Sequence, residues 1–210
     1  MIGNFYRDGK LYCTEPIKVY DHDFSTFSEG VIIPHGIYDI NRNEGYITIG
    51  ISKDTSEFCC DCIRNWWNTT GKINYPLANS ILVLADGGGS NSSRHHIFKE
   101  DLQKLVNDIG VEIRMAHYPP YTSKYNPIEH RLFCHVTAAC EGVVFKSVEI
   151  VKDLISKTST STGLNVISTI QDKVYSLGRK VCETFKKNMP IIFDEDLGKW
   201  NYRAIPQILM

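Results

Sequence analysis

One carboxylate, Asp86, stands at the end of an apolar run and is followed at once by three glycines, in the segment SILVLADGGGSNSSRHHIF (residues 80–98). In open α/β sheets, ligands bind beyond the carboxyl ends of the strands, where such a carboxylate would face them. The glycines would leave room for a bulky ligand to approach the backbone. The alternative is a plain turn that Asp86 caps. A phosphate-binding P-loop is excluded, because no Gly-Lys-Ser/Thr follows at the required spacing.

A second carboxylate, Glu129, lies in the segment HYPPYTSKYNPIEHRLF (residues 117–133). Asn126 can cap a helix that begins with Pro127, and Glu129 then completes a capping box, which explains it without any function. Aromatic and basic residues surround Glu129, however, and such residues can stack on bases and bind phosphates. The predicted nucleic-acid contacts are Lys124, Tyr125, Asn126, His130 and Arg131, with His117, Tyr118 and Tyr121 in the same neighbourhood.

Two carboxylates on separate elements can share a divalent metal ion. Their hard oxygen atoms favour Mg²⁺ or Mn²⁺, and two such ions about 4 Å apart can activate a hydroxyl and stabilise the leaving oxygen of a phosphodiester. Asp86 and Glu129 are too few to hold both ions, so a third carboxylate is expected. The alternative is a hydrolase that uses the pair as acid and base on a glycoside, which the basic, tyrosine-rich loop beside Glu129 disfavours.

The elements that would position these residues follow from hydrophobic periodicity and turn signals. In chain order we expect a hairpin of GIYDI and GYITIGI, a helix over 55–67, a buried central strand ILVLA, a helix over 94–109, a strand VEIRMAHY, a helix from Asn126 and a last helix near 164–187. Asp54 is the predicted N-cap of the first helix, with Glu57 at the capping-box position. This order predicts an α/β fold with a mixed sheet.

Length and composition are those of one ordinary globular domain. The chain has 210 residues and a formal net charge of −1, so attraction of the whole chain to nucleic acid is not expected, although a local basic face remains open. Seven cysteines include a single CxxC, Cys59 and Cys62, with no second pair to complete a zinc site. They are interpreted as reduced cytosolic thiols, those of CCDC as small buried hydrophobic residues. Neither a signal peptide nor a membrane span is predicted.

Together, the strings ADGGGSN and PPYTSKYNPIEHRLF resemble the DDE transposases of bacterial insertion sequences, and in particular the Rhodopirellula-type DDE domain. The likeness extends to IPHGIYDINRNEGYITIG, STSTGLNV and the closing WNY, so that it covers about residues 2–206. It implies one RNase H-like domain over residues 1–210, with a mixed sheet flanked by helices. It also implies DNA cleavage and strand transfer with Mg²⁺ or Mn²⁺, two ions being expected in an intact site. Asp86 would be the second catalytic aspartate and Glu129 the glutamate, both of them metal ligands.

The chain departs from the family pattern at its start. The family's first aspartate lies on the first strand, shortly before a string similar to IGNF, which here begins at Ile2. We therefore expect the first strand, the first aspartate and the N-terminal helix-turn-helix region to be missing, and the chain alone to be inactive. Asp8, Asp39 and Asp54 are not expected to substitute, because metal ligands need tight geometry on rigid elements. The missing strand would also leave a sheet edge unpaired.

The partners that the resemblance implies are DNA, as transposon ends and as target, and a second copy of the chain or a full-length transposase. The implied location is the bacterial cytoplasm, at the nucleoid. The alternative function is a non-catalytic remnant that binds DNA or a transposase. The two functions differ in whether a first aspartate is supplied by an upstream reading frame or by another chain.

Overall fold

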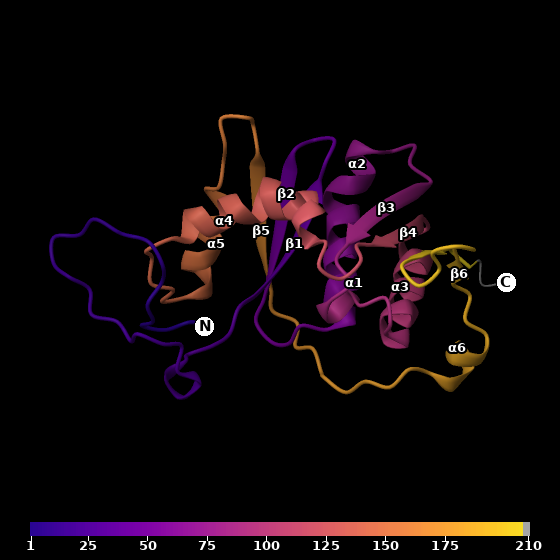
Figure 1. The fold of residues 1–210 in the computed structure, drawn as a ribbon, viewed down its shortest axis with the longest axis horizontal. Coiled ribbons are helices and arrows are strands. Elements are labelled where there is room, and N and C mark those ends of the chain that lie inside the picture. The colour runs from indigo at the N-terminus through magenta and orange to yellow at the C-terminus, as the bar shows by residue number, and fades with distance from the viewer. Residues whose placement is uncertain (208–210) are drawn as a thin grey trace. The chain divides into compact units, whose positions relative to one another are not determined.

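A computed structural model describes residues 1–207, with the backbone alone at Ser123. Its helices and strands form a mixed α/β structure with two sheets (Figure 1). The chain divides into two compact units. The first unit comprises Met1–Ser52 and Pro127–Val174, and the second comprises Lys53–Asn126 and the segment from Tyr175 onward.

The first unit is built on a three-stranded sheet in the order β1-β2-β5. β1 (Ile33–Asp39) and β2 (Glu44–Gly50) are antiparallel and form the predicted hairpin, whereas β5 (Asn165–Gln171) is parallel to β2. At the hairpin turn, Asp39 Oδ1 accepts hydrogen bonds from two backbone N–H groups at 3.1 and 3.2 Å. Asp39 therefore stabilises the turn.

The core of the first unit lies between this sheet and two helices, α4 (Cys134–Cys140) and α5 (Val148–Ser156). The hydroxyl oxygen of Ser147 caps α5 by accepting a hydrogen bond from the backbone N–H of Ile150 at 3.3 Å. The buried apolar side chains of this core are Ile2, Ile47, Ile49, Leu132, Val136, Val151, Ile155, Leu164 and Val166. The segment before β1 is irregular apart from the short turn η1 (Ser25–Phe27), as expected.

The predicted helix near 164–187 is wrong. β5 occupies its first part, and the only helix is the short α6 (Glu183–Lys187) at its end. Along β5 burial alternates, with Val166 buried and Ile167 42% exposed. β-Branched side chains fit such a half-buried pleated strand, and pairing with β2 therefore outweighs the helical spacing of the apolar residues.

The second unit contains a four-stranded sheet in the order β3-β4-β7-β6. β3 (Ser80–Ala85) and β4 (Glu112–His117) are parallel, whereas β7 (Asn201–Ala204) is antiparallel both to β4 and to β6 (Ile192–Phe193). β4 is the strand predicted from VEIRMAHY. The sheet is therefore mixed, as the order of the sequence elements indicated.

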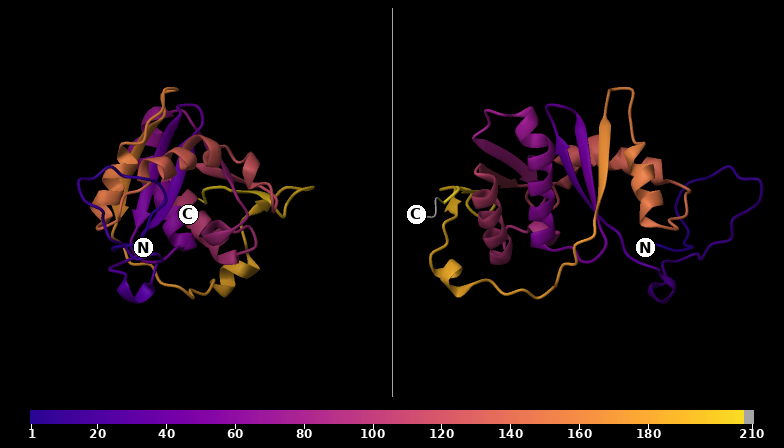
Figure 2. Two further views of the ribbon diagram at one scale, coloured as in Figure 1. Left: turned by 60° about the vertical axis from the view of Figure 1, so that its left-hand side comes forward. Right: turned by 180° about the vertical axis from the view of Figure 1, so that it is seen from behind.

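Two helices of this unit, α1 (Ser56–Trp66) and α3 (His96–Ile109), lie side by side (Figure 2). α3 confirms the predicted helix, and it ends as predicted at Gly110, whose φ of 70° is the left-handed conformation of a glycine cap. A π-turn, η2 (Trp67–Gly71), and the short α2 (Lys72–Asn74) follow α1.

The cap of α1 differs from the prediction. Thr55, not Asp54, is the N-cap, and its hydroxyl oxygen accepts a hydrogen bond from the backbone N–H of Phe58 at 3.2 Å. The cap therefore lies one residue later than predicted, and Glu57 does not take the capping-box position. Asp54 is exposed just before the helix, where it is free to serve another purpose.

The cysteines agree with their interpretation as thiols. All seven are free, and Cys59, Cys60 and Cys62 are buried on α1. Burial raises the pKa of the Cys59 and Cys60 thiols, which are therefore neutral. These residues act as small apolar side chains of the core.

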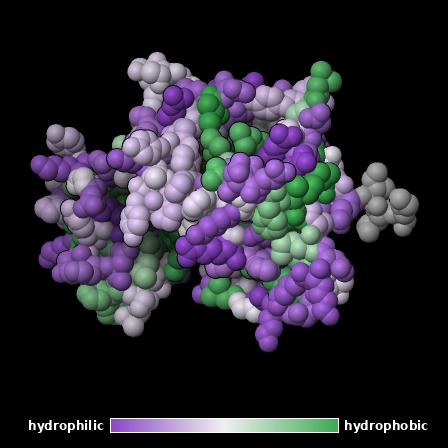
Figure 3. All heavy atoms as spheres, turned by 45° about the vertical axis from the view of Figure 1, so that its right-hand side comes forward, coloured by the Kyte–Doolittle hydropathy of each residue, from purple (hydrophilic) through white to green (hydrophobic). Residues whose placement is uncertain are grey.

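The run ILVLA predicted a buried central strand. In the described residues, however, β3 lies at the edge of its sheet. Ala85 is buried on one face of the strand, whereas Leu82 is 63% exposed on the other. Hydrophobic residues reach the surface of the molecule among hydrophilic ones (Figure 3). A continuous apolar run is typical of burial on both faces, but in residues 1–207 only one face of β3 is well covered.

Candidate active site

Asp86 is the first residue after β3, where the sequence predicted it. The ladder between β3 and β4 ends at the pair Ala85 and His117, and the backbone N–H of Tyr118 then donates to the carbonyl of Ala85 at 2.8 Å. The side chain of Asp86 is exposed. A carboxylate at this place is held by a regular element and is open to a ligand.

The three glycines after Asp86 differ in what they require. Gly89 has a φ of +63°, which favours glycine. Gly88 has an ordinary extended backbone (φ −108°, ψ 173°), and a Cβ added there would meet nothing within 4 Å. The nearest atom to a Cβ on Gly87 would be the Tyr118 carbonyl oxygen, at 3.5 Å, which is ordinary contact. A plain turn therefore explains why residue 89 is glycine. In the described residues, neither the backbone conformation nor a close contact requires glycine at positions 87 and 88.

A second carboxylate, Asp54, lies close to this turn. Its Oδ2 would be 3.7 Å from a Cβ on Gly89. Asp54 was predicted to cap α1, a role that Thr55 fills instead. Asp54 and Asp86 therefore belong to the same unit and flank the same glycine turn.

A buried polar cluster contacts the backbone of Asp86. His117 is 5% exposed; its Nδ1 lies 3.0 Å from the Asp86 carbonyl oxygen and its Nε2 lies 2.9 Å from the Tyr202 hydroxyl. Lys99 is 4% exposed, its Nζ donates to the carbonyl of Ser93, and it lies 4.9 Å from the centre of the Tyr202 ring. His117 is thus enclosed in the protein with both ring nitrogens in contact with protein atoms.

Burial shifts the pKa values of this cluster and so determines its protonation states. It lowers the pKa of His117, although the hydrogen bond to the Asp86 carbonyl acts in the opposite direction. It also lowers the pKa of Lys99 and raises the pKa of Tyr202. His117 is therefore a neutral imidazole and Tyr202 a neutral phenol at pH 7. Sequence reasoning missed Lys99 and Tyr202, because nothing in their spacing indicates that they approach Asp86.

Glu129 belongs to the first unit, at the start of the π-turn η5 (Glu129–Phe133), which leads into α4. Its side chain is exposed, whereas Leu132, three residues later, is fully buried. π-Turns inside helices are frequent at functional sites. Glu129 is therefore presented to solvent by an element whose opposite side is anchored in the core.

Two glycines of the hairpin provide that anchor. A Cβ on Gly45 would lie 2.3 Å from Leu132 Cδ1, and a Cβ on Gly36 would lie 2.6 Å from Phe133 Cζ. No side chain larger than hydrogen fits at either position unless the π-turn moves. The sequence GIYDINRNEGY therefore helps to position Glu129, although it is more than eighty residues away.

We expect Gly45→Ala to lower the free energy of unfolding by about 1–3 kcal/mol, because the new methyl group overpacks the site of Leu132. Urea denaturation measures the change. Gly30→Ala is the matched control, since a Cβ there would meet nothing within 4 Å, and its effect should stay within about 0.5 kcal/mol. Equal stabilities of the two variants would contradict the close contact between Gly45 and Leu132.

The predicted nucleic-acid contacts differ in exposure. Lys124 and Tyr125 are exposed, with Lys124 Nζ 5.0 Å from the centre of the Tyr125 ring, and His130 and Arg131 are exposed in the first unit. Asn126 is 6% exposed. Four of the five predicted contacts are thus open to solvent, and Asn126 is enclosed by the protein.

Within residues 1–207, no group of three or more His, Cys, Asp or Glu side chains is arranged to hold a metal ion. Asp86 and Glu129 belong to different units, and each presents an exposed carboxylate, the oxygen donor that Mg²⁺ and Mn²⁺ prefer. No helix in the described part of the chain is long and apolar enough to cross a bilayer.

Comparison with models of protein families identifies a family for this chain. The family model described as the Rhodopirellula transposase DDE domain matches residues 1–206, and thus both units. No curated protein and no solved structure matches the chain.

Proposed function

Because the chain belongs to the Rhodopirellula transposase DDE domain family, whose members typically use a divalent metal ion, we propose that it is the catalytic domain of a DNA transposase, with Asp86 and Glu129 as its metal ligands. The observation that carries the proposal is the exposed carboxylate of Asp86 at the end of β3. It is followed by Gly87 and Gly88, at two positions where the backbone would accept a larger residue. The open space beside Gly88 can admit a DNA backbone.

The proposed fold is a single RNase H-like domain over residues 1–210. Its support is the family match, which runs through both compact units without interruption. The mixed sheets, with a hairpin in one unit and the parallel pair β3 and β4 in the other, agree with the proposal. Asp86 and Glu129 are the two metal ligands that this domain is proposed to supply.

The donor set fits Mg²⁺ or Mn²⁺, with two ions in an intact site. Bound there, the ions would supply an activated hydroxyl and charge stabilisation at the leaving oxygen of a phosphodiester. The chain's own part is to hold two carboxylates on regular elements and to hold the DNA. Lys124, His130 and Arg131 would bind phosphates, and the exposed Tyr125 ring would stack on an unpaired base.

We propose that residues 1–210 are inactive by themselves, because two carboxylates are too few for two ions and no three-ligand group occurs in the described residues. Asp8, Asp39 and Asp54 are not proposed as the third ligand, and Asp39 is already committed to the hairpin turn. The third carboxylate would come from an upstream reading frame or from another chain, such as a second copy or a full-length transposase. The proposed partners are otherwise the transposon ends and the target DNA, at the bacterial nucleoid.

The test compares two proteins. The DNA upstream of the coding sequence is read in all three frames, and an encoded strand that carries an aspartate is joined in frame before residue 1 to give the extended chain. The extended chain should nick transposon-end DNA with Mg²⁺ or Mn²⁺, and residues 1–210 alone should not. Nicking by residues 1–210 that Asp86→Ala abolishes would overturn the proposed incompleteness. An extended chain that folds and never nicks would overturn the proposed function.

Gly88→Ala should separate folding from DNA access. An alanine is compatible with the backbone at this position, so the free energy of unfolding should change by less than about 0.5 kcal/mol. The nicking rate of the extended chain should fall by about 10-fold or more if DNA occupies the space beside Gly88, a loss of about 1.4 kcal/mol in transition-state stabilisation. Urea denaturation and a nicking assay measure the two effects, and an unchanged nicking rate would contradict this use of the space.

DNA binding by the basic residues should depend on salt. Lys124→Ala and Arg131→Ala should each weaken binding of the chain to DNA and lower the slope of log K against log salt concentration by about 1. Fluorescence anisotropy over a salt series measures the slope. Lys157→Ala, an exposed site at the end of α5, should leave it unchanged, and the same slope in all four proteins would exclude direct phosphate contacts from these two residues.

A further inference from the structure

The loop that carries Asp86 is fastened at both ends by buried side chains. At its start, the Asp86 carbonyl oxygen contacts His117 Nδ1 at 3.0 Å. At its end, the Ser93 carbonyl accepts a hydrogen bond from Lys99 Nζ. His117 and Lys99 both contact Tyr202, through its hydroxyl group and the face of its ring respectively. The two ends of the loop are thus joined through one residue of β7.

The contacts determine which nitrogen of His117 carries the proton. A carbonyl oxygen only accepts hydrogen bonds, so Nδ1 must donate to Asp86. In a neutral imidazole Nε2 is then an acceptor, and it receives the hydroxyl proton of Tyr202 at 2.9 Å. The rings of His117 and Tyr202 also stack at a centroid distance of 5.5 Å. The Asp86 carbonyl therefore fixes the tautomer of His117, and Tyr202 holds the orientation of its ring.

We propose that His117, Tyr202 and Lys99 form a clamp that positions Asp86 for metal binding, with Tyr202 as its centre. The proposal rests on the proposed function in one respect, namely that Asp86 is a metal ligand. The three residues are positioning residues, because they contact the backbone of the loop and not the carboxylate.

The clamp would restrain a part of the backbone that is otherwise weakly held. Asp86 is the first residue beyond the last pair of the ladder, and the glycines that follow it restrain the backbone less than any other residue. A ligand must be held closely for tight metal binding, and residues that orient a ligand commonly change metal affinity by 10–100-fold. The backbone N–H of Tyr118 donates to Ala85, one residue before Asp86, whereas His117 contacts the backbone of Asp86 itself.

Burial and ring contacts also restrain the side chains of the clamp. His117, Tyr202 and Lys99 are each at most 5% exposed. Phe98 adds an edge-on ring contact to His117 at 6.4 Å, and Phe193 lies 5.7 Å from Lys99 Nζ. Movement of His117 away from Asp86 would leave the buried imidazole without this hydrogen-bond partner, which is unfavourable.

The experiment measures residues 1–210 by NMR, with Tyr202→Phe as the main variant and Tyr12→Phe, a fully exposed site, as its matched control. Nitrogen shifts should report the neutral Nδ1–H tautomer of His117 in the wild type and in Tyr12→Phe. In Tyr202→Phe, His117 should keep the Nδ1–H tautomer, because the Asp86 carbonyl still accepts from Nδ1, but its ring loses the hydroxyl contact at Nε2, so the amides of residues 86–89 should become more mobile. Mn²⁺, added as the probe, should broaden these amides at concentrations about 10-fold higher in Tyr202→Phe.

Two further variants keep the result interpretable. His117→Asn retains an N–H donor close to the position of Nδ1, so it should recover Mn²⁺ affinity relative to His117→Ala if positioning is the role. An Nε2–H tautomer in the wild type, or equal amide mobility and Mn²⁺ affinity in folded Tyr202→Phe, would overturn the clamp. Asp86→Asn tests the premise separately, because unchanged Mn²⁺ broadening in this variant would refute Asp86 as a ligand, while the tautomer and the amide mobility would still decide the clamp.

Discussion

Asp86→Asn and Glu129→Gln should each lower the metal-dependent nicking rate of the extended chain by about 1,000-fold or more. Each change replaces an anionic oxygen donor by a neutral amide of the same shape, so the site loses charge while the fold is kept. A loss of this size corresponds to about 4 kcal/mol of transition-state stabilisation. Single-turnover nicking at saturating Mg²⁺ measures it.

The control for these variants is Asp39→Asn, a half-buried aspartate at the end of β1. An asparagine there keeps the side-chain oxygen that accepts the two turn hydrogen bonds, so nicking should stay within about 2-fold, or 0.4 kcal/mol. Thermal unfolding of all three variants separates lost chemistry from lost structure. Full activity in folded Asp86→Asn would remove Asp86 from the proposed site.

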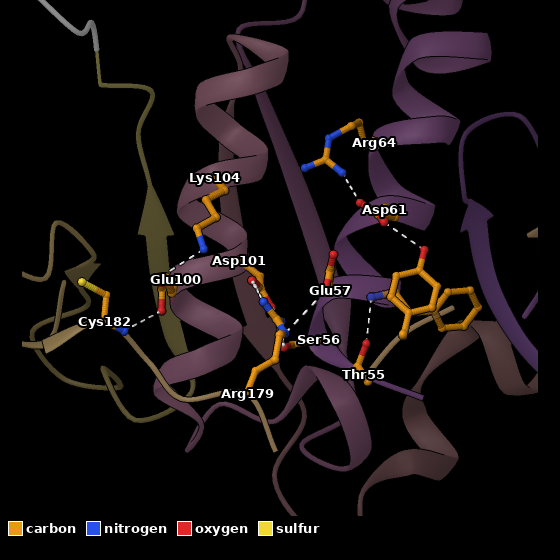
Figure 4. A network of polar contacts seen from close by, with 12 residues as sticks. Thr55, Ser56, Glu57, Asp61, Arg64, Glu100, Asp101, Lys104, Arg179 and Cys182 are labelled. Atoms are coloured by element: carbon orange, nitrogen blue, oxygen red, sulfur yellow. Dashed lines mark hydrogen bonds and ion pairs between the residues drawn. The ribbon is translucent and has the colours of Figure 1, made fainter. Parts of the chain in front are cut away.

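Arg179→Ala should lower the free energy of unfolding by about 3 kcal/mol. Arg179 lies on the segment before α6 and binds side chains of both α1 and α3 (Figure 4). It donates to both carboxylate oxygens of Asp101, one bond being 3.1 Å, and its Nε lies 3.4 Å from Glu57 Oε2. Asp101 is 4% exposed, so removal of Arg179 leaves a buried charge that keeps, in the described network, the hydrogen bond donated by Ser56 Oγ at 2.6 Å.

Urea denaturation measures this loss, and two controls define it. Lys186→Ala removes an exposed ion pair with Glu183 and should cost less than about 0.5 kcal/mol. Adding Asp101→Asn to Arg179→Ala removes the uncompensated charge and should recover part of the stability. A loss for Arg179→Ala no larger than that for Lys186→Ala would mean that the network does not hold this segment to the helices.

Local signals in the sequence predict several elements because their causes are local. Gly110 ends α3 through its own left-handed backbone, and the hairpin follows from two β-rich runs around NRNEG. Asp86 could be placed at a strand end for the same reason. In contrast, β5 becomes a strand only because it pairs with β2, and Tyr202 reaches His117 across 85 positions of sequence. Such contacts depend on tertiary packing, which spacing along the chain does not encode.

The same distinction applies to the candidate site. The types and spacing of Asp86 and Glu129 indicate oxygen ligands on two elements, and the glycines suggest room for a ligand. The anchoring of Glu129 by Gly45 and Leu132 depends on how closely the hairpin approaches the π-turn. Glycine in a strand signals such an approach, but its partner cannot be identified from the sequence alone.

The central claim is that Asp86 and Glu129 bind one shared cation, and iron-directed cleavage tests it most directly. Fe²⁺ can occupy oxygen-ligand sites in place of Mg²⁺, and with ascorbate and peroxide it cuts the backbone beside its ligands. The account predicts cuts near residues 86 and 129, both suppressed by Mg²⁺ and both lost in either Asp86→Asn or Glu129→Gln. Cuts near residue 86 that persist unchanged in Glu129→Gln would contradict it.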